Sequence, residues 1–256
     1  MRTNTLKQKL AQGKTAFGAI VSGYSPETVE LFGAMGYDFV FIDGEHGPMS
    51  VDQVENMVRA AESFGITPVA RIPDHADTTI LRFLDRGVQG IVIPHVNTAA
   101  QAEAIAKASR YYPDGHRGVG GARPGDYGVG VTREESSRWI NANVLVIPMI
   151  EEVEAVRNLD AILRVPGIDM LHVAAGDLGQ SMGYPRQEEV WRVMEEVVRK
   201  VRAAGKWVSV GGNAPNNPKQ VAQFFKAGAN ACTISASGLL RIAADDFRKQ
   251  ALPSPQ

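Results

Sequence analysis

Cysteine is almost absent from this sequence of 256 residues, where Cys232 is the only one. A single cysteine forms no intrachain disulfide and provides no cluster of thiolate metal ligands. A disulfide-stabilised fold and a cysteine-based metal centre are therefore excluded. The scarcity is typical of a protein that works in a reduced compartment.

Long apolar runs and an excess of one charge are also missing. No segment approaches the roughly 20 apolar residues of a membrane span, and the stretch MRTNTLKQKLAQGKTAFG lacks the apolar core of a signal peptide. The 27 basic and 28 acidic residues leave a net charge of −1. Nucleic acids and anionic membranes are bound by clustered Lys and Arg, so we expect neither as a partner. We expect a cytoplasmic protein.

Eight short apolar runs alternate with helical patterns along almost the whole chain. They are continuous rather than alternating, which suits parallel strands that are covered on both faces. The predicted strands are 17–21, 38–42, 67–71, 90–94, 144–150, 169–174, 207–211 and 230–234. Eight strand–helix pairs in about 250 residues predict an α/β fold, a (β/α)8 TIM barrel, as a single domain over residues 1–256. A doubly wound sheet is the competing fold, but no G-x-G-x-x-G follows the first strand.

Several helix boundaries are marked by their own residues. Ser25-Pro26 predicts a helix start with proline at its first position, and Ser50 predicts another N-cap.

The segment 111–139 between the fourth and fifth strands is rich in glycine and aromatic residues. It lacks the Lys and Ser/Thr of a phosphate-binding loop, so we interpret it as a largely irregular, flexible connection.

Polar side chains gather where the predicted strands end. They are Asp43, Glu45 and His46 in FIDGEHGP, then Arg71, His95, Glu151 and Asp177. In a barrel the C-terminal ends of the strands form one rim, where barrel enzymes place their chemistry. Each residue alone has an ordinary explanation, such as an Asx turn or a structural ion pair. Their coincidence on one rim favours an active site.

This set of side chains indicates a particular chemistry. Carboxylates without cysteine or paired histidines favour a divalent cation with oxygen ligands, Mg²⁺ or Mn²⁺. An arginine offers a planar fork for a substrate carboxylate, and a histidine beside an aspartate suits a general base. Cation and arginine together would stabilise the enolate of a 2-keto acid.

Lysine is missing from the strand ends. The lysines are at 7, 9, 14, 107, 200, 206, 219, 226 and 249. A Schiff-base aldolase needs a lysine inside the barrel, so imine chemistry is not expected.

Several segments together resemble the HpcH/HpaI family of class II, pyruvate-dependent aldolases. They are FVFIDGEHGP, VARI, RFLDRGVQGIVIPHV, RGVG, MIEEVEAVRNLDAILRVPGIDMLHVAAGDLGQSMGYP and AGANACTIS. The resemblance runs through nearly the whole chain and keeps the order and spacing of the motifs. It implies reversible aldol cleavage of a 4-hydroxy-2-keto acid to pyruvate, or a related acid such as hydroxypyruvate, and an aldehyde.

The resemblance also implies roles for individual residues. Glu151 and Asp177 match the two protein ligands of the divalent metal, for which Co²⁺ is a further option. Arg71 matches the arginine that holds the pyruvyl oxygens and stabilises the enolate. Backbone amides of Gly176 and Asp177 match those that bind the pyruvate carboxylate.

A second set of implied roles concerns protons and assembly. His46 matches the acid–base histidine, with Asp43 in the same motif, and Asp85 matches an aspartate that pairs with this histidine across a subunit boundary. The family is hexameric, a trimer of dimers, with the C-terminal helix exchanged between barrels. Here SGLLRIAADDFRKQ would be that helix.

The chain departs from the family pattern in three places. Met149 stands where the family often has Gln, Ala174-Ala175 replaces a common Gly-Pro, and the loop 121–130 differs from that of the heptanedioate enzymes. The aldehyde product is therefore not transferred from the family. The alternatives to an aldol lyase are a metal-dependent decarboxylase or acyl lyase on oxaloacetate-like substrates, and a non-catalytic barrel that binds keto acids.

Overall fold

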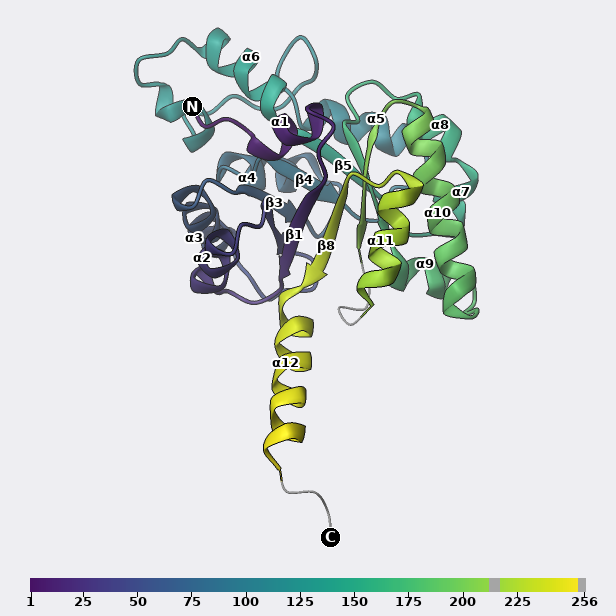
Figure 1. The fold of residues 1–256 in the computed structure, drawn as a ribbon. Coiled ribbons are helices and arrows are strands. Elements are labelled where there is room, and N and C mark those ends of the chain that lie inside the picture. Colours follow the sequence, from purple (N-terminus) through teal and green to yellow (C-terminus); the bar gives the residue numbers. More distant parts are fainter. Residues whose placement is uncertain (212–216, 253–256) are drawn as a thin grey trace.

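The computed structural model describes residues 1–211 and 217–252 and contains a closed barrel of parallel strands (Figure 1). The strands are β1 (Ala16–Val21), β2 (Phe39–Asp43), β3 (Thr67–Arg71), β4 (Gly90–Ile93), β5 (Leu145–Ile150), β6 (Met170–Ala174), β7 (Trp207–Gly211) and β8 (Ala231–Ser235). β1 pairs with β8 through Ala16↔Ala231, which closes the barrel. The TIM barrel is confirmed, and each strand lies within one residue of its predicted bounds.

Most of the helices surround the barrel, and both faces of the strands are covered. They are α2 (Pro26–Ala34), α3 (Val51–Ser63), α4 (Asp77–Asp85), α5 (Ala99–Ala108), α7 (Val153–Arg157), α8 (Leu159–Leu163), α9 (Ala175–Ser181), α10 (Gln187–Ala203) and α11 (Pro218–Ala227). β2, β4 and β5 are buried at every residue, as continuous apolar strands require. Inside the barrel, Phe41, Val69 and Ile147 form an inner core, and Leu6 and Leu10 of α1 (Thr5–Ala11) pack against it.

The predicted helix caps are present. The Ser25 hydroxyl accepts a hydrogen bond from the Thr28 amide at 3.2 Å, with Pro26 at the first position of α2. Ser50 and Gln53 form a capping box at the start of α3, where each satisfies an amide that the helix leaves without a partner. These caps fix where α2 and α3 begin after the first two strands.

The segment between β4 and β5 is more regular than predicted. Residues 111–122 are irregular, but a 3₁₀ helix η1 (Arg123–Gly128) and α6 (Arg133–Asn143) follow. The prediction of an irregular connection is therefore wrong for its second half. Thr132 and Glu135 form the capping box that starts α6, a signal that was visible in the sequence. α6 and α1 lie at the N-terminal end of the barrel, away from the rim (Figure 1).

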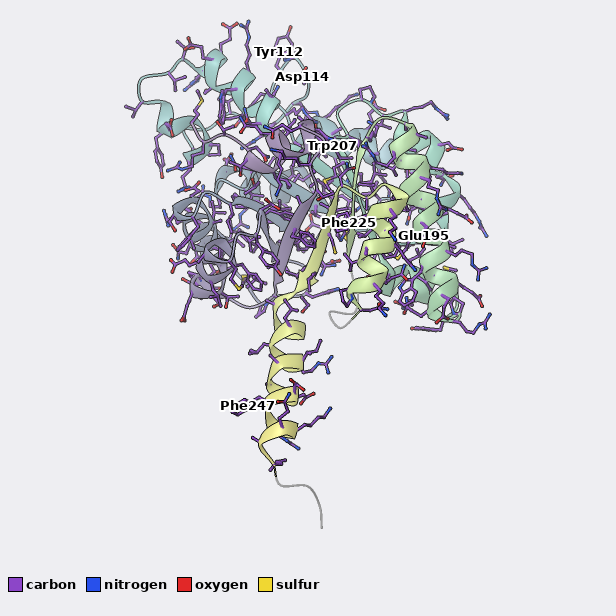
Figure 2. All side chains as sticks on the ribbon, viewed as in Figure 1. Tyr112, Asp114, Glu195, Trp207, Phe225 and Phe247 are labelled. Carbon is purple, nitrogen blue, oxygen red and sulfur yellow. The ribbon has the colours of Figure 1, made fainter. Side chains whose placement is uncertain are left out.

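The last helix, α12 (Ala236–Ala251), leaves the body of the protein. It continues directly from β8 and projects away from the barrel (Figure 1). None of its residues is buried, and Phe247, 76% exposed, points into open space (Figure 2). No helix in the described part of the chain is long and apolar enough to cross a membrane.

Candidate active site

The turn after β2 is organised by Asp43, which is 3% exposed. One carboxylate oxygen accepts hydrogen bonds from the amides of Glu45 (3.3 Å) and His46 (3.2 Å), and the other from the Ser22 hydroxyl (3.2 Å). Gly47 is required because a Cβ there would lie 2.3 Å from the Asp43 carbonyl oxygen. Asp43 thus binds the backbone amide of His46.

Arg71, at the end of β3, is held across the rim by Asp43 and Glu45. Its Nε and Nη2 donate to the two Asp43 oxygens at 3.0 and 2.9 Å, and Nη1 lies 3.0 Å from Glu45 Oε2. Burial raises the pKa of Asp43, but the Arg71 hydrogen bonds and charge outweigh it and leave that pKa lowered. Burial lowers the pKa of Arg71, and Asp43, Glu45 and Glu151 more than reverse this. The guanidinium is therefore charged and fixed in orientation.

Glu151 ends β5 and is 1% exposed. Its Oε1 accepts a hydrogen bond from the His95 amide at 2.8 Å, and within the described residues Oε2 receives none. Burial raises the pKa of Glu151, and the nearby charges of Asp177 and Glu45 raise it further, against the opposing effect of His95. The chain thus buries a carboxylate whose charge is poorly compensated, which a cation would relieve.

Asp177 and Gly176 lie in the first turn of α9, directly after β6. A Cβ at Gly176 would meet no atom within 4 Å, so its backbone borders open space. In the described part of the chain, no group of three or more His, Cys, Asp and Glu side chains is arranged to hold a metal. Two carboxylates fit Mg²⁺ or Mn²⁺, which keep several water or substrate ligands, but would not suffice for a closed protein cage.

His95, which was expected at the rim but without a specific role, and Glu152 both lie at this rim. The His95 Nδ1 is 2.8 Å from Glu152 Oε1, and its Nε2 is 3.7 Å from Glu45 Oε1. Burial lowers the pKa of His95, but the hydrogen bond to Glu152 and the charges of Glu151 and Glu45 leave it raised. The position of His95 directly after the fourth strand was the available signal.

His46 and Asp85 are not brought together within one chain. The His46 side chain is exposed, and its ring makes no hydrogen bond to the described residues. Asp85 ends α4 near the N-terminal end of the barrel, where Arg117 donates to it at 2.8 Å. Their pairing across a subunit boundary stays a prediction.

Beneath the rim the barrel interior holds Met149 and His172. Met149 is 1% exposed and packs in the inner core. The His172 Nδ1 is 2.6 Å from the Ser209 hydroxyl, and burial, with the charge of Arg71, lowers the pKa of His172 to about 3. The floor of the site is therefore uncharged at neutral pH.

Comparisons with known proteins identify the family of this chain. The chain matches the HpcH/HpaI aldolase/citrate lyase family over residues 17–244. A 2-keto-3-deoxy-L-rhamnonate aldolase of Shigella sonnei (strain Ss046) is 34% identical over 251 residues, which cover 96% of this chain and 92% of that one. An HpcH/HpaI family protein from Burkholderia cenocepacia J2315 superposes with a TM-score of 0.88 at 29% identity, covering 98% and 100% of the two chains.

A second solved structure carries a different activity in its name. The citrate synthase SbnG is 30% identical and superposes with a TM-score of 0.85, covering 96% of this chain and 97% of that chain. The family match spans most of the barrel, and the polar rim lies within it. The chain belongs to the HpcH/HpaI aldolase/citrate lyase family and is an aldolase, a carbon–carbon lyase.

Proposed function

We propose that this enzyme reversibly cleaves a 4-hydroxy-2-keto acid to an aldehyde and pyruvate, or a related 2-keto acid such as hydroxypyruvate. The observation that carries the proposal is the buried, poorly compensated Glu151 carboxylate on the same rim as the oriented Arg71 guanidinium. The names of the aldolase relatives, which act on a 2-keto-3-deoxy acid, support this substrate class.

Glu151 and Asp177 are the proposed protein ligands of a divalent cation. Mg²⁺ and Mn²⁺ suit two carboxylates best, and Co²⁺ is also compatible with them. When bound, the cation supplies Lewis-acid stabilisation of negative charge on the keto oxygen of the substrate.

The remaining residues would bind the substrate and move its protons. Asp43 accepts hydrogen bonds from Nε and Nη2 of Arg71, and Glu45 lies 3.0 Å from Nη1, so substrate oxygens would bind at Nη1 by displacing Glu45. Amides in the first turn of α9, at Gly176 and Asp177, have no acceptor in their own helix and would receive the substrate carboxylate. His46 would take the proton of the 4-hydroxyl group, with Asp85 of a neighbouring subunit orienting its ring.

Pyruvate release tests this proposal directly. The protein would be incubated with candidate 4-hydroxy-2-keto acids, and pyruvate would be followed by coupled oxidation of NADH. We expect turnover that a chelator abolishes and that Mg²⁺ or Mn²⁺ restores. Turnover that resists exhaustive chelation would refute the metal-dependent mechanism.

A second candidate activity is suggested by the similarity to a citrate synthase. The same rim would then act on oxaloacetate-like substrates, by decarboxylation or by carbon–carbon cleavage. Oxaloacetate turnover above its rate with free metal ion, together with no cleavage of any 4-hydroxy-2-keto acid, would favour this candidate.

We further propose that α12 packs against another copy of this chain, in a homo-oligomer of six subunits. The helix exposes Leu240 (71%) and Phe247 (76%), which are unfavourable in water. At its base lies a hollow lined in part by Leu31 of α2 and by Met35, the residue after α2, which are both more than half exposed. The apolar face of a neighbour's α12 would cover such a surface.

Measuring the oligomeric state tests the proposed packing of α12 against another copy of the chain. The double variant Leu240→Glu, Phe247→Glu should reduce the molar mass found by light scattering, because two charges would be buried at the interface. Lys249→Glu, on the same helix, is the matched control and should leave the mass unchanged. An unchanged mass in the double variant would contradict exchange of α12.

A further inference from the structure

His95 has an unusual backbone conformation for its position. Its φ is 53°, in the left-handed region that side chains other than glycine disfavour. Among the described residues only three other non-glycine residues share this feature, and they lie in η1 or just after α9. His95 instead lies two residues after Ile93, the last residue of β4, on the rim that carries the candidate site. Strain of this kind persists only where the surroundings hold it in place.

The left-handed turn directs the amide of His95 toward Glu151. The distance from the His95 nitrogen to Glu151 Oε1 is 2.8 Å, and the carboxylate is almost completely buried. A hydrogen bond from a fixed amide orients the carboxylate and satisfies one oxygen. The other oxygen, Oε2, is thereby left for a further ligand.

The ring of His95 is tied to a second element. Its Nδ1 is 2.8 Å from Glu152 Oε1, while Asn97 donates to Glu152 Oε2 at 3.0 Å. Asn158 in turn donates to the carbonyl of Asn97 at 2.8 Å. This chain of bonds connects the turn after β4 with the end of β5, and it resists rotation of the His95 backbone back to an ordinary conformation.

We propose that His95 is a positioning residue for the metal site. Its left-handed backbone, held by the bond between its ring and Glu152, presents the amide that aims Glu151 at the cation. The orientation of Glu151 depends on the backbone conformation of His95, so the main-chain amide contributes more to it than the imidazole does. This inference depends on the proposed role of Glu151 as a metal ligand.

Two substitutions at position 95 separate the effect of the backbone conformation from the effect of the imidazole ring. His95→Val keeps an amide but disfavours a positive φ, because its β-branched side chain crowds the left-handed backbone. His95→Gly keeps the amide and adopts a positive φ freely, although it loses the ring. Residues that orient a metal ligand typically contribute 10- to 100-fold in metal affinity. We expect His95→Val to bind Mn²⁺ about tenfold more weakly than the wild type, and His95→Gly about threefold more weakly.

Glu152 gives an independent test of the hydrogen bond that holds the His95 ring. Glu152→Ala removes the partner of the ring and should weaken Mn²⁺ binding about threefold. Glu152→Gln can still accept the hydrogen bond from the ring, although it loses the one from Asn97, and should weaken binding less than Glu152→Ala. Glu154→Gln, an exposed position on the same helix, is the matched control. Mn²⁺ dissociation constants would be measured by titration calorimetry and by paramagnetic resonance of free Mn²⁺, with melting temperatures as a check on folding.

The outcomes distinguish this inference from the proposed function. If His95→Val binds Mn²⁺ within twofold of the wild type, or if His95→Gly loses as much affinity as His95→Val, the inference is overturned. His95→Ala replaces the valine variant if the latter does not fold. A wild-type protein that binds no Mn²⁺ would instead contradict the proposed metal site itself.

Discussion

The two ends of the barrel differ in how buried and half-buried carboxylates are paired with basic side chains. At the N-terminal end, Asp169 pairs with Arg110 at 2.6 Å and with Lys7 at 3.1 Å. At the C-terminal end, Glu151 and Asp177 lie near each other. Among the described residues, the only basic side chain within ion-pair distance of either carboxylate is the His95 ring, 3.6 Å from Glu151. Asp169 is thus neutralised by two basic side chains, whereas Glu151 and Asp177 have no Lys or Arg partner among the described residues, although Arg71 on the same rim pairs with Asp43 and Glu45.

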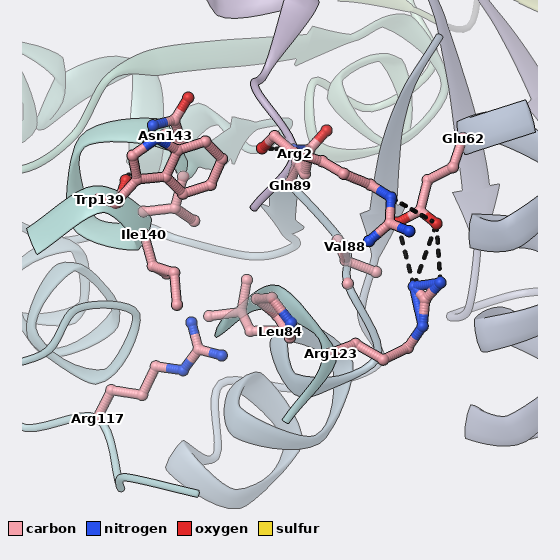
Figure 3. Close-up of a pocket in the computed structure, with 13 residues that line it drawn as sticks. Arg2, Glu62, Leu84, Val88, Gln89, Arg117, Arg123, Trp139, Ile140 and Asn143 are labelled. Atoms are coloured by element: carbon pink, nitrogen blue, oxygen red, sulfur yellow. Dashed lines mark hydrogen bonds and ion pairs between the residues drawn. The ribbon is translucent and has the colours of Figure 1, made fainter. Parts of the chain in front are cut away.

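The compensated end also surrounds a hollow in the structure. There Arg123 donates to both oxygens of Glu62, and Arg2 lies 3.2 Å from the same carboxylate (Figure 3). Arg117, on the far side of this hollow, is bound to Asp85 instead. Removing one partner from such a network would destabilise the N-terminal end, because it leaves a buried charge without a partner. At the C-terminal end, the Glu151 and Asp177 carboxylates, which no Lys or Arg of the described residues pairs with, are suited to bind a cation. Substitutions at the two ends should therefore separate stability from activity.

The largest expected effect is at the rim. Glu151→Gln removes a proposed metal ligand but keeps an acceptor for the His95 amide, so metal-dependent turnover should be abolished. The metal-free protein should be as stable as the wild type or more stable, because a buried carboxylate with a raised pKa has been neutralised. Turnover after chelation and reloading, together with urea unfolding, measures both effects. Full activity, or a large loss of stability, would count against the contrast between the ends.

The next effect concerns His46, the proposed general base. His46→Ala should lower aldol cleavage by about 10²- to 10⁴-fold, the usual contribution of a general base. Oxaloacetate decarboxylation should fall less, since loss of CO₂ needs no proton from a hydroxyl group. Both activities would be compared on one metal-loaded preparation. An equal fall in the two would assign His46 to charge stabilisation or to architecture.

At the compensated end the effect should be on stability alone. Asp169→Ala leaves Arg110 and Lys7 without their shared carboxylate, and breaking a buried pair of this kind costs about 3–5 kcal/mol. The kcat of the protein that remains folded should not change. Urea denaturation and active-site-normalised kinetics would show this, and a specific loss of kcat would link the two ends.

A smaller effect is expected from pH. The pKa of His172 is about 3 in the folded protein, below its ordinary 6.5, so the unfolded chain binds a proton that the folded chain does not. The neutral His172 therefore contributes its full share to the free energy of unfolding above pH 6.5. As the pH falls below that value, the free energy of unfolding decreases, by about 2 kcal/mol at pH 5. His172→Asn, which can keep the bond to Ser209, should reduce the loss between pH 7 and 5. An unchanged pH dependence would mean that other groups dominate.

The smallest effect tests the orientation of the arginine. Arg71→Lys keeps the charge but cannot make both bonds to Asp43 and also face the substrate, so kcat/KM should fall at least about tenfold, or 1.4 kcal/mol. Steady-state kinetics with the best keto acid would measure it. Kinetics near those of the wild type would remove Arg71 from substrate binding.

Most of the fold and part of the site could be predicted from the sequence. The strands were recognisable because both of their faces are buried, which leaves continuous apolar runs such as VFI in β2. α6 was missed because the glycines before it outweighed the capping signal of Thr132 and Glu135. The collection of Arg71, Glu151 and Asp177 on one rim followed from barrel geometry, since each lies at or just after a strand end.

The sequence by itself determined the barrel, the rim and the family, because these depend on periodicity and on residue types at strand ends. Only the tertiary structure decided which side chains are partners. Asp43 binds Arg71 and the backbone of its own turn, and His95 turns its amide to Glu151 from a different strand. Such pairings depend on backbone dihedrals and on contacts between residues far apart in the chain, and no local pattern of residues specifies them.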